Sequence, residues 1–213
     1  MQHRTSSARH AAALLIVVAA TAANAAPDSG ALIARLARPP PASIAFAEVR
    51  FSTLLREPLV VSGTLKYASS GVLERHVEIP YRERTTIRDE TVRIERDGES
   101  ARTFALRRAP ELRGLLTVMG GLLAGDGSLI ARHFDVTASG DDARWRLDLT
   151  PTDARLRQHL ADIVIVGGEA EPHCFVLRGD RNGASIMLLG AAAAWPLSPP
   201  LAMPELLDRC GAE

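Results

Sequence analysis

Leu59–Tyr67 (LVVSGTLKY) and Val72–Ile79 (VLERHVEI) are neighbouring stretches of alternating and β-branched residues, each short enough for a single strand. Between them lies Ala68-Ser69-Ser70-Gly71, whose small and polar residues are typical of a turn. From Ser43 onward the preceding segment also alternates, and one face carries Ala45, Ala47, Val49 and Phe51. The opposite face carries Glu48, Arg50 and Ser52. The region therefore predicts consecutive antiparallel strands.

Strand character recurs through the rest of the chain at intervals of about 8–12 residues. Val92–Glu95 and Thr103–Leu106 flank Asp97-Gly98, a strong hairpin signal, and Asn182-Gly183 predicts another tight turn. Further strands are expected at His133–Ala138, Arg144–Thr150, Asp162–Val166, Cys174–Leu177 and Ser185–Leu189. Regular alternation of strands with helices, which an α/β fold requires, is not found. The pattern predicts an all-β sheet or barrel with a few helices.

Three segments have helical spacing. Ala31–Arg38 ends at a run of three prolines, and Thr152–Ala161 begins with the capping candidates Thr152 and Asp153. The longest segment follows Pro110, and its apolar stripe consists of Leu112, Leu115, Leu116, Met119, Leu122 and Leu123. Gly120 and Gly121 weaken this helix, each by about 1 kcal/mol relative to alanine. An apolar helix with a weak middle suits a movable lid.

Residues 1–25 have the organisation of a secretory signal peptide. Arg4 and Arg9 precede the uncharged stretch Ala11–Ala23, and Ala23-Asn24-Ala25 forms a small-x-small cleavage site. Thirteen helical residues span about 20 Å, which is short of the roughly 30 Å of a bilayer core. Ala26, rather than cysteine, follows the cleavage site, so no lipid anchor is expected there. We expect a soluble periplasmic protein with a single domain at residues 26–213.

The charge balance excludes two classes of protein. The chain has 25 basic and 25 acidic residues, and loss of the two leader arginines leaves 23 against 25, a net charge of −2. A nucleic-acid binder would carry a basic excess, as would a polybasic membrane-surface protein.

Cys174 and Cys210 are the only cysteines in the chain. In an oxidising compartment such a pair favours a disulfide, and the alternative is two free buried thiols.

Catalytic and metal-binding patterns are weak. The chain has no nucleophile elbow, P-loop or zinc-protease motif, and neither His133 nor His159 has a nucleophile signature nearby. Glu169–Cys174 gathers four possible metal ligands, but no second cluster completes a site, and a charged turn explains it more simply. We therefore expect no enzyme activity, no metal and no cofactor, with a hydrolase using one of these histidines as the remaining alternative.

The order of the motifs resembles that of the LolA family, the periplasmic carriers of outer-membrane lipoproteins, and in particular its LolA-like branch. The resemblance extends from Leu32 to Leu189. An amphipathic helix precedes Phe46–Phe51 (FAEVRF), Gly63–Tyr67 (GTLKY) matches a G-x-L strand, and Leu147–Pro151 (LDLTP) matches an L-x-L-x-P strand end. A strand pair and the leucine-rich helix lie between them in the family's order.

This resemblance implies an incomplete, curved antiparallel β-barrel whose concave, apolar face is covered by a helical lid. Acyl chains would bind between sheet and lid without a cofactor. The implied ligand-binding residues are Leu65, Tyr67, Val72 and Leu73 on the sheet and Leu112, Leu115, Leu116, Met119, Leu122 and Leu123 on the lid. One departure concerns the lid, because Ser69-Ser70 replaces an Arg-Pro pair that the family's carriers use in lid closure.

The resulting hypothesis is a monomeric periplasmic carrier that moves the acyl chains of a lipoprotein or another lipid toward the outer membrane. It would need an inner-membrane donor and an outer-membrane acceptor. The alternative is a binding or sensor module on the same half-barrel that does not transport its ligand.

Overall fold

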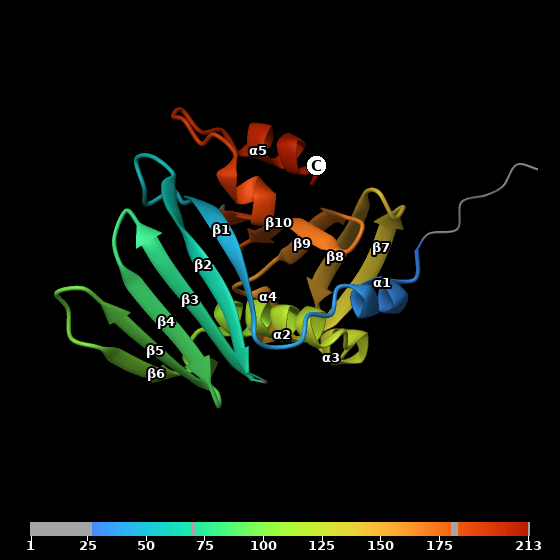
Figure 1. Cartoon of the computed structure of the whole chain (residues 1–213), viewed down its shortest axis with the longest axis horizontal. Helices are drawn as coiled ribbons and strands as arrows, with labels where there is room; N and C mark the ends of the chain where they lie inside the picture. The colour runs from blue at the N-terminus through green and yellow to red at the C-terminus, as the bar shows by residue number, and fades with distance from the viewer. Residues whose placement is uncertain (1–26, 70, 180–182, 213) are drawn as a thin grey trace, which may run out of the picture.

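The computed structural model describes residues 27–69, 71–179 and 183–212, and its main element is one antiparallel sheet of eleven strands. The strands are β1 (Ala42–Phe51), β2 (Leu59–Ser69), β3 (Val72–Ile79), β4 (Glu83–Arg88), β5 (Thr91–Arg96), β6 (Arg102–Ala105), β7 (Phe134–Gly140), β8 (Trp145–Pro151), β9 (Asp162–Gly168), β10 (Glu171–Arg178) and β11 (Ala184–Leu189). The sheet is curved and open, as the family resemblance implied (Figure 1).

The strand order explains where the long helix must lie. The order is β6-β5-β4-β3-β2-β1-β11-β10-β9-β8-β7, so two meanders meet where β1 pairs with β11. The chain therefore has to travel from one free edge, β6, to the other, β7. It does so through η1 (Leu106–Arg108), α2 (Pro110–Ala124) and α3 (Gly127–Ala131). This connection places α2 across the concave side, between the two arms of the sheet (Figure 1).

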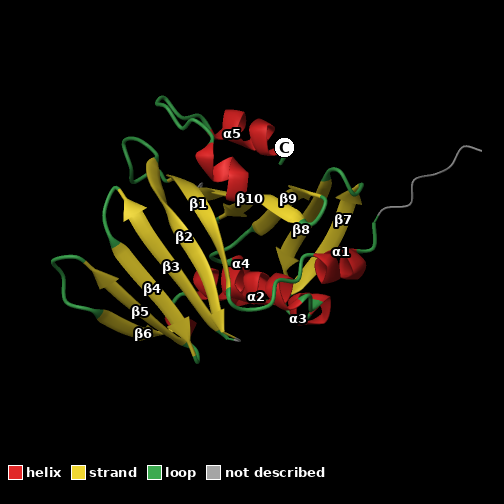
Figure 2. Cartoon of the chain, in the orientation of Figure 1, coloured by secondary structure: helices red, strands yellow, loops and turns green. Residues whose placement is uncertain are grey.

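Local signals define the ends of the helices. In α2, Pro110 occupies the first turn, and the helix ends at Gly125, whose φ of 67° is favourable for glycine. The Asp126 side chain then accepts a hydrogen bond from the backbone N–H of Leu129, which starts α3. The other helices are α1 (Ser29–Arg35), α4 (Ala154–Arg157), η2 (Gly190–Ala194) and α5 (Met203–Cys210). Figure 2 shows these helices lying on both sides of the sheet.

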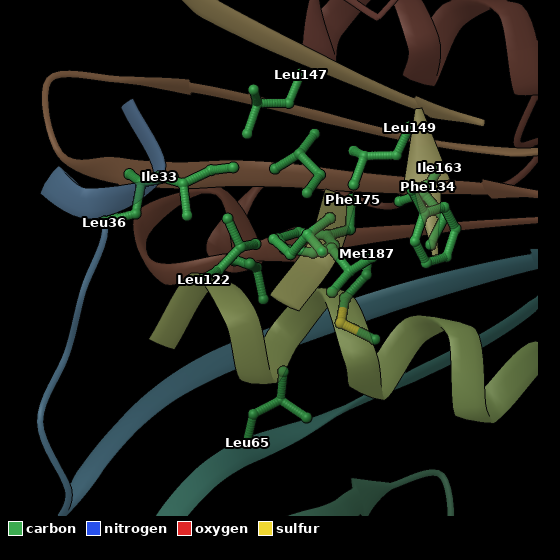
Figure 3. Close-up of a cluster of buried hydrophobic side chains, with 14 of the residues drawn as sticks. Ile33, Leu36, Leu65, Leu122, Phe134, Leu147, Leu149, Ile163, Phe175 and Met187 are labelled. Atoms are coloured by element: carbon green, nitrogen blue, oxygen red, sulfur yellow. The ribbon is translucent and has the colours of Figure 1, made fainter. Parts of the chain in front are cut away.

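Each face of the sheet has its own hydrophobic core. The concave core joins α1, α2 and α3 to strands from both arms, and Figure 3 shows part of it, including Leu65, Leu122, Phe175 and Met187. The convex core lies under η2 and α5, and its centre is formed by Val49, Val176, Ile186 and Leu188, all fully buried. Both faces are apolar because successive residues of a strand point to opposite sides.

The disulfide prediction is confirmed. Cys174 of β10 is bonded to Cys210 of α5, and their Cα atoms are 5.9 Å apart. The bond fixes the C-terminal helix to the convex face, and Arg178 Nη2 donates a hydrogen bond to the carbonyl of Ala212 beside it.

The predicted elements differ from the structure in several places, and α3 and α5 were not predicted. The sequence reading missed β4 (ERTTIR), because its charged and threonine residues give little hydrophobic alternation. The expected helix at Thr152–Ala161 contains only four α-helical residues, and Asp153, one of its two predicted capping residues, caps it. The first helix was expected at Ala31–Arg38, whereas α1 runs from Ser29 to Arg35. The signal peptide and Asn182 lie outside the described residues, so those predictions stay untested.

No helix in the described part of the chain is both long and apolar enough to span a membrane.

Candidate functional site

A cavity of about 380 Å³ lies between α2 and the concave face of the sheet. Its walls come from β1, β2, β3 and β4 on one arm, from β10 and β11 on the other, and from α2 above them. Most of the lining is aliphatic, and a few charged groups, among them Arg38, Lys66, Glu74, Arg75 and Glu171, also line it. Its size and apolar lining are typical of a small-molecule site.

Nine of the ten predicted binding residues line this cavity. They are Leu65, Tyr67 and Leu73 from the sheet and Leu112, Leu115, Leu116, Met119, Leu122 and Leu123 from α2. Val72 is the exception: it is buried but is not part of the lining. Adjacent residues of a strand face opposite sides, so Val72 and Leu73 cannot both point to the concave face. The sequence reading placed these neighbours in one site, whereas the structure places only Leu73 in the cavity lining.

One side of α2 packs against the concave core, and another side lines the cavity. Val118 and Leu122 are buried in the concave core. Gly121 lies so close to Ile130 of α3 that a Cβ would collide with its side chain, whereas nothing lies within 4 Å of a Cβ at Gly120. The two glycines therefore differ: Gly121 allows close helix packing, and only Gly120 is free of a packing role.

The C-terminal end of the lid is tied to the sheet by Arg38. Its backbone N–H donates to the carbonyl of Leu123 at 2.9 Å. Its guanidinium donates to the carbonyl of Ala170 and to Glu171 Oε1, both at 2.7 Å. Sequence reasoning missed this contact because the three elements that Arg38 connects are far apart in the chain.

A buried ionic network lies on the concave face beside the cavity. Glu48 Oε1 accepts hydrogen bonds from Arg50 Nε at 2.7 Å and Ser185 Oγ at 2.6 Å, and Oε2 accepts one from Arg75 Nη2 at 2.6 Å. Burial alone would raise the pKa of the Glu48 carboxyl, but the hydrogen bonds and charges of Arg50 and Arg75, with Ser185, lower it below its ordinary value. Glu48 is therefore ionised at neutral pH.

The alternation of β1 did contain a signal for this network. Glu48 and Arg50 share a face with Phe46, whose ring lies 4.8 Å from the guanidinium carbon of Arg75. A large aromatic residue on an otherwise charged face indicates burial of that face.

The candidates for other chemistry are dispersed. His133 and His159 are exposed and do not line the cavity. In the Glu169–Cys174 segment, Cys174 forms the disulfide and Glu171 pairs with Arg38. Among the described residues, no three His, Cys, Asp or Glu side chains lie close enough together to hold a metal ion.

One family model matches most of the chain. The family described as "Outer membrane lipoprotein carrier protein LolA-like" matches residues 20–200. The LolA superfamily protein NE2245 from Nitrosomonas europaea is 10% identical and has a TM-score of 0.42, covering 78% of this chain and 92% of that one. LprF from Mycobacterium bovis is 12% identical with a TM-score of 0.34, over 83% and 99% of the two chains. No curated protein matches.

Proposed function

The chain belongs to the LolA-like family of outer membrane lipoprotein carrier proteins, and from this premise we propose that it carries acyl chains between membranes. In this proposal the protein is secreted to the periplasm, loads the chains of a lipoprotein or other lipid from an inner-membrane donor, and delivers them to an outer-membrane acceptor. It acts as a monomer and uses no cofactor or covalent chemistry.

The observation that carries the proposal is the cavity between α2 and the concave face. Its aliphatic lining comes from a lid and a sheet that are separate elements, so a chain could enter when they part. Burying a methylene group contributes about 0.8 kcal/mol, so a 16-carbon chain gains on the order of 10 kcal/mol before costs. Opening the cavity and ordering the chain offset much of that gain, which leaves release feasible.

The disulfide supports the proposed location. Structural disulfides persist in oxidising compartments such as the bacterial periplasm. The bond between Cys174 and Cys210 is therefore consistent with secretion by the predicted leader.

Lipid uptake tests the proposal directly. Protein purified from the periplasm should contain lipid detectable by native mass spectrometry, and the delipidated protein should take up a fluorescent fatty acid. A lipid-free mass together with no uptake would contradict the carrier function.

The lid assignment has a matched pair of variants on α2. Leu116 lines the cavity, so Leu116→Asp should abolish uptake by placing a charge in an apolar site. Thr117, the next residue, does not line the cavity, and Thr117→Asp should keep uptake. Circular dichroism and thermal unfolding must show that both variants are folded, and uptake by a folded Leu116→Asp protein would refute the lid assignment.

A binding or sensor module that does not transport its ligand is the second candidate, because Ser69 stands where the family's carriers have the arginine of lid closure. A transfer assay between donor and acceptor vesicles distinguishes the two. Binding without transfer, when the membrane partners are present, would favour the module.

A further inference from the structure

Arg75 brings a positive charge to the wall of an otherwise mainly apolar cavity. Its side chain is only 16% exposed, and it reaches from β3 toward β1. Nη2 donates to Glu48 Oε2 at 2.6 Å, while Nη1 is 3.9 Å from Glu83 Oε1, too far for a hydrogen bond. A guanidinium has five N–H donors, so Arg75 retains donors that the protein does not use.

One of the unused donors of Arg75 is its Nε atom. Among the described residues it is the one buried side-chain nitrogen or oxygen without a hydrogen-bond partner. Leaving a buried donor unpaired is unfavourable, and the penalty is larger for a charged group. The structure thus holds a buried cation whose hydrogen bonds are incomplete.

The two carboxylates nearest Arg75 are shared with other arginines. The carboxylate of Glu48 is shared between Arg75 and Arg50, and Glu83 Oε2 already accepts two hydrogen bonds from Arg96. Neither Glu48 nor Glu83 is therefore reserved for Arg75, whereas Arg96 has a further partner in Glu99. Arg50 and Arg96 are 44% and 33% exposed and are partly hydrated, which leaves Arg75 as the least solvated cation.

Thr85 adds a second polar group beside Arg75. The two residues are direct partners across β3 and β4, and both line the cavity. Thr85 is buried as a residue, and its hydroxyl makes no hydrogen bond with any other described residue, but unlike Arg75 Nε it is not a fully enclosed atom. The pair adds polar groups to the sheet side of a cavity whose α2 side is aliphatic.

We propose that the cavity selects an anionic amphiphile, whose carboxylate or phosphate lies at Arg75 and Thr85 while its chain lies along α2. The planar guanidinium fits the two oxygens of either group, and the low-dielectric surroundings strengthen the contact. This inference rests on the proposed lipid binding and adds the head-group chemistry to it.

The test compares palmitate with hexadecanol, which share a chain length and differ in charge. Dissociation constants are measured by competition with a fluorescent fatty acid. The unmodified protein should prefer palmitate roughly ten- to hundredfold, the range for a hydrogen bond to a charged group. Equal binding of the two ligands would overturn the proposal, whereas binding of neither would contradict the carrier function itself.

Variants locate the head group. Arg75→Met should remove the preference while keeping hexadecanol affinity, and Arg75→Lys should restore part of it. Lys66→Met removes another cavity-lining cation and serves as the matched control. If the preference survives in Arg75→Met but disappears in Lys66→Met, the proposed position is wrong.

Thr85→Val keeps the test decisive if Arg75→Met does not fold. It preserves the shape of the side chain, removes the hydroxyl, and should weaken palmitate binding more than hexadecanol binding. An unchanged ratio of the palmitate and hexadecanol dissociation constants would exclude Thr85 from the site. A second comparison uses dipalmitoyl phosphatidic acid and dipalmitoylglycerol, which share their chains and differ in a phosphate. Together, the two comparisons show whether the cavity binds a carboxylate or a phosphate head group.

Discussion

The concave and convex faces of the sheet are built from the same strands but are completed in different ways. On the convex face, α5 places Leu206 and Cys210 into a core of fully buried aliphatic residues and is joined to β10 by the disulfide. On the concave face, α2 covers the sheet without filling the space, and a cavity of about 380 Å³ remains.

The difference lies in how each covering helix is attached. The convex helix is fixed by a covalent bond and by close packing, so it is suited to stability. The lid is held by apolar contacts and by the hydrogen bonds of Arg38, which can separate and reform. One face thus stabilises the sheet while the other retains a cavity, and several predictions test this separation.

The largest expected effect is on the convex face. Replacing both cysteines, Cys174→Ser with Cys210→Ser, should reduce the free energy of unfolding by about 4 kcal/mol, the chain-entropy value for a loop of this length. Urea unfolding measures the loss. Fatty-acid uptake below the transition should be unchanged, and a loss of uptake in the folded variant would show that the faces are coupled.

A somewhat smaller effect is expected on the concave face. Glu48→Gln should destabilise the protein by roughly 3 kcal/mol near neutral pH, because it leaves buried arginines without their counter-charge. The native pKa of Glu48 is below its ordinary value of 4.5, so the carboxylate stabilises the fold above that pH. The stabilisation is lost as the pH falls through the lowered native pKa.

The difference in unfolding free energy between the unmodified protein and Glu48→Gln should therefore shrink on acidification. Urea unfolding at neutral pH and in acid measures it. Glu95→Gln, which removes a carboxylate from an exposed pair with Arg93, is the control and should change stability little. A difference that stays constant with pH would show that Glu48 acts through its shape and not through its charge.

The smallest effects separate the two adjacent lid glycines. Gly121→Ala should lower stability by about 1–3 kcal/mol, because the added methyl group meets Ile130 and the carbonyl of Asp126. Gly120→Ala should raise stability by up to about 1 kcal/mol, because its Cβ meets no other atom and alanine favours the helix. Thermal unfolding of the two proteins gives opposite shifts, and shifts of the same sign would contradict this distinction.

Gly120→Ala also tests whether the lid must bend. If uptake depends on a weak middle of α2, this variant should take up fatty acid more slowly although it is more stable. An unchanged uptake rate would indicate that the lid moves as a rigid helix.

Much of the fold was predictable because it depends on local periodicity. The stripe of leucines after Pro110 predicted α2 and six of the cavity residues, since helical spacing places them on neighbouring faces. The strands with clear hydrophobic alternation were predicted as well. β4 was not, because it is stabilised by pairing with β3 and β5 and not by its own sequence pattern.

The site was less predictable where it depends on contacts between distant segments. The residues of the buried network come from β1, β3 and β11, and Arg38 connects the lid to the β9–β10 turn. Val72 lies outside the cavity lining for a related reason, because sequence proximity does not specify which face of a strand is concave.

By itself, the sequence determined the mainly β fold, the apolar lid helix and the pair of cysteines, because alternation, helical spacing and residue type act within short segments. Only the tertiary structure decided that β1 pairs with β11, that the lid therefore crosses the concave face, and that Arg75 and Thr85 meet at the cavity wall. These features depend on which strands become neighbours. That choice is made by burial of both faces of the whole sheet and not by any one segment.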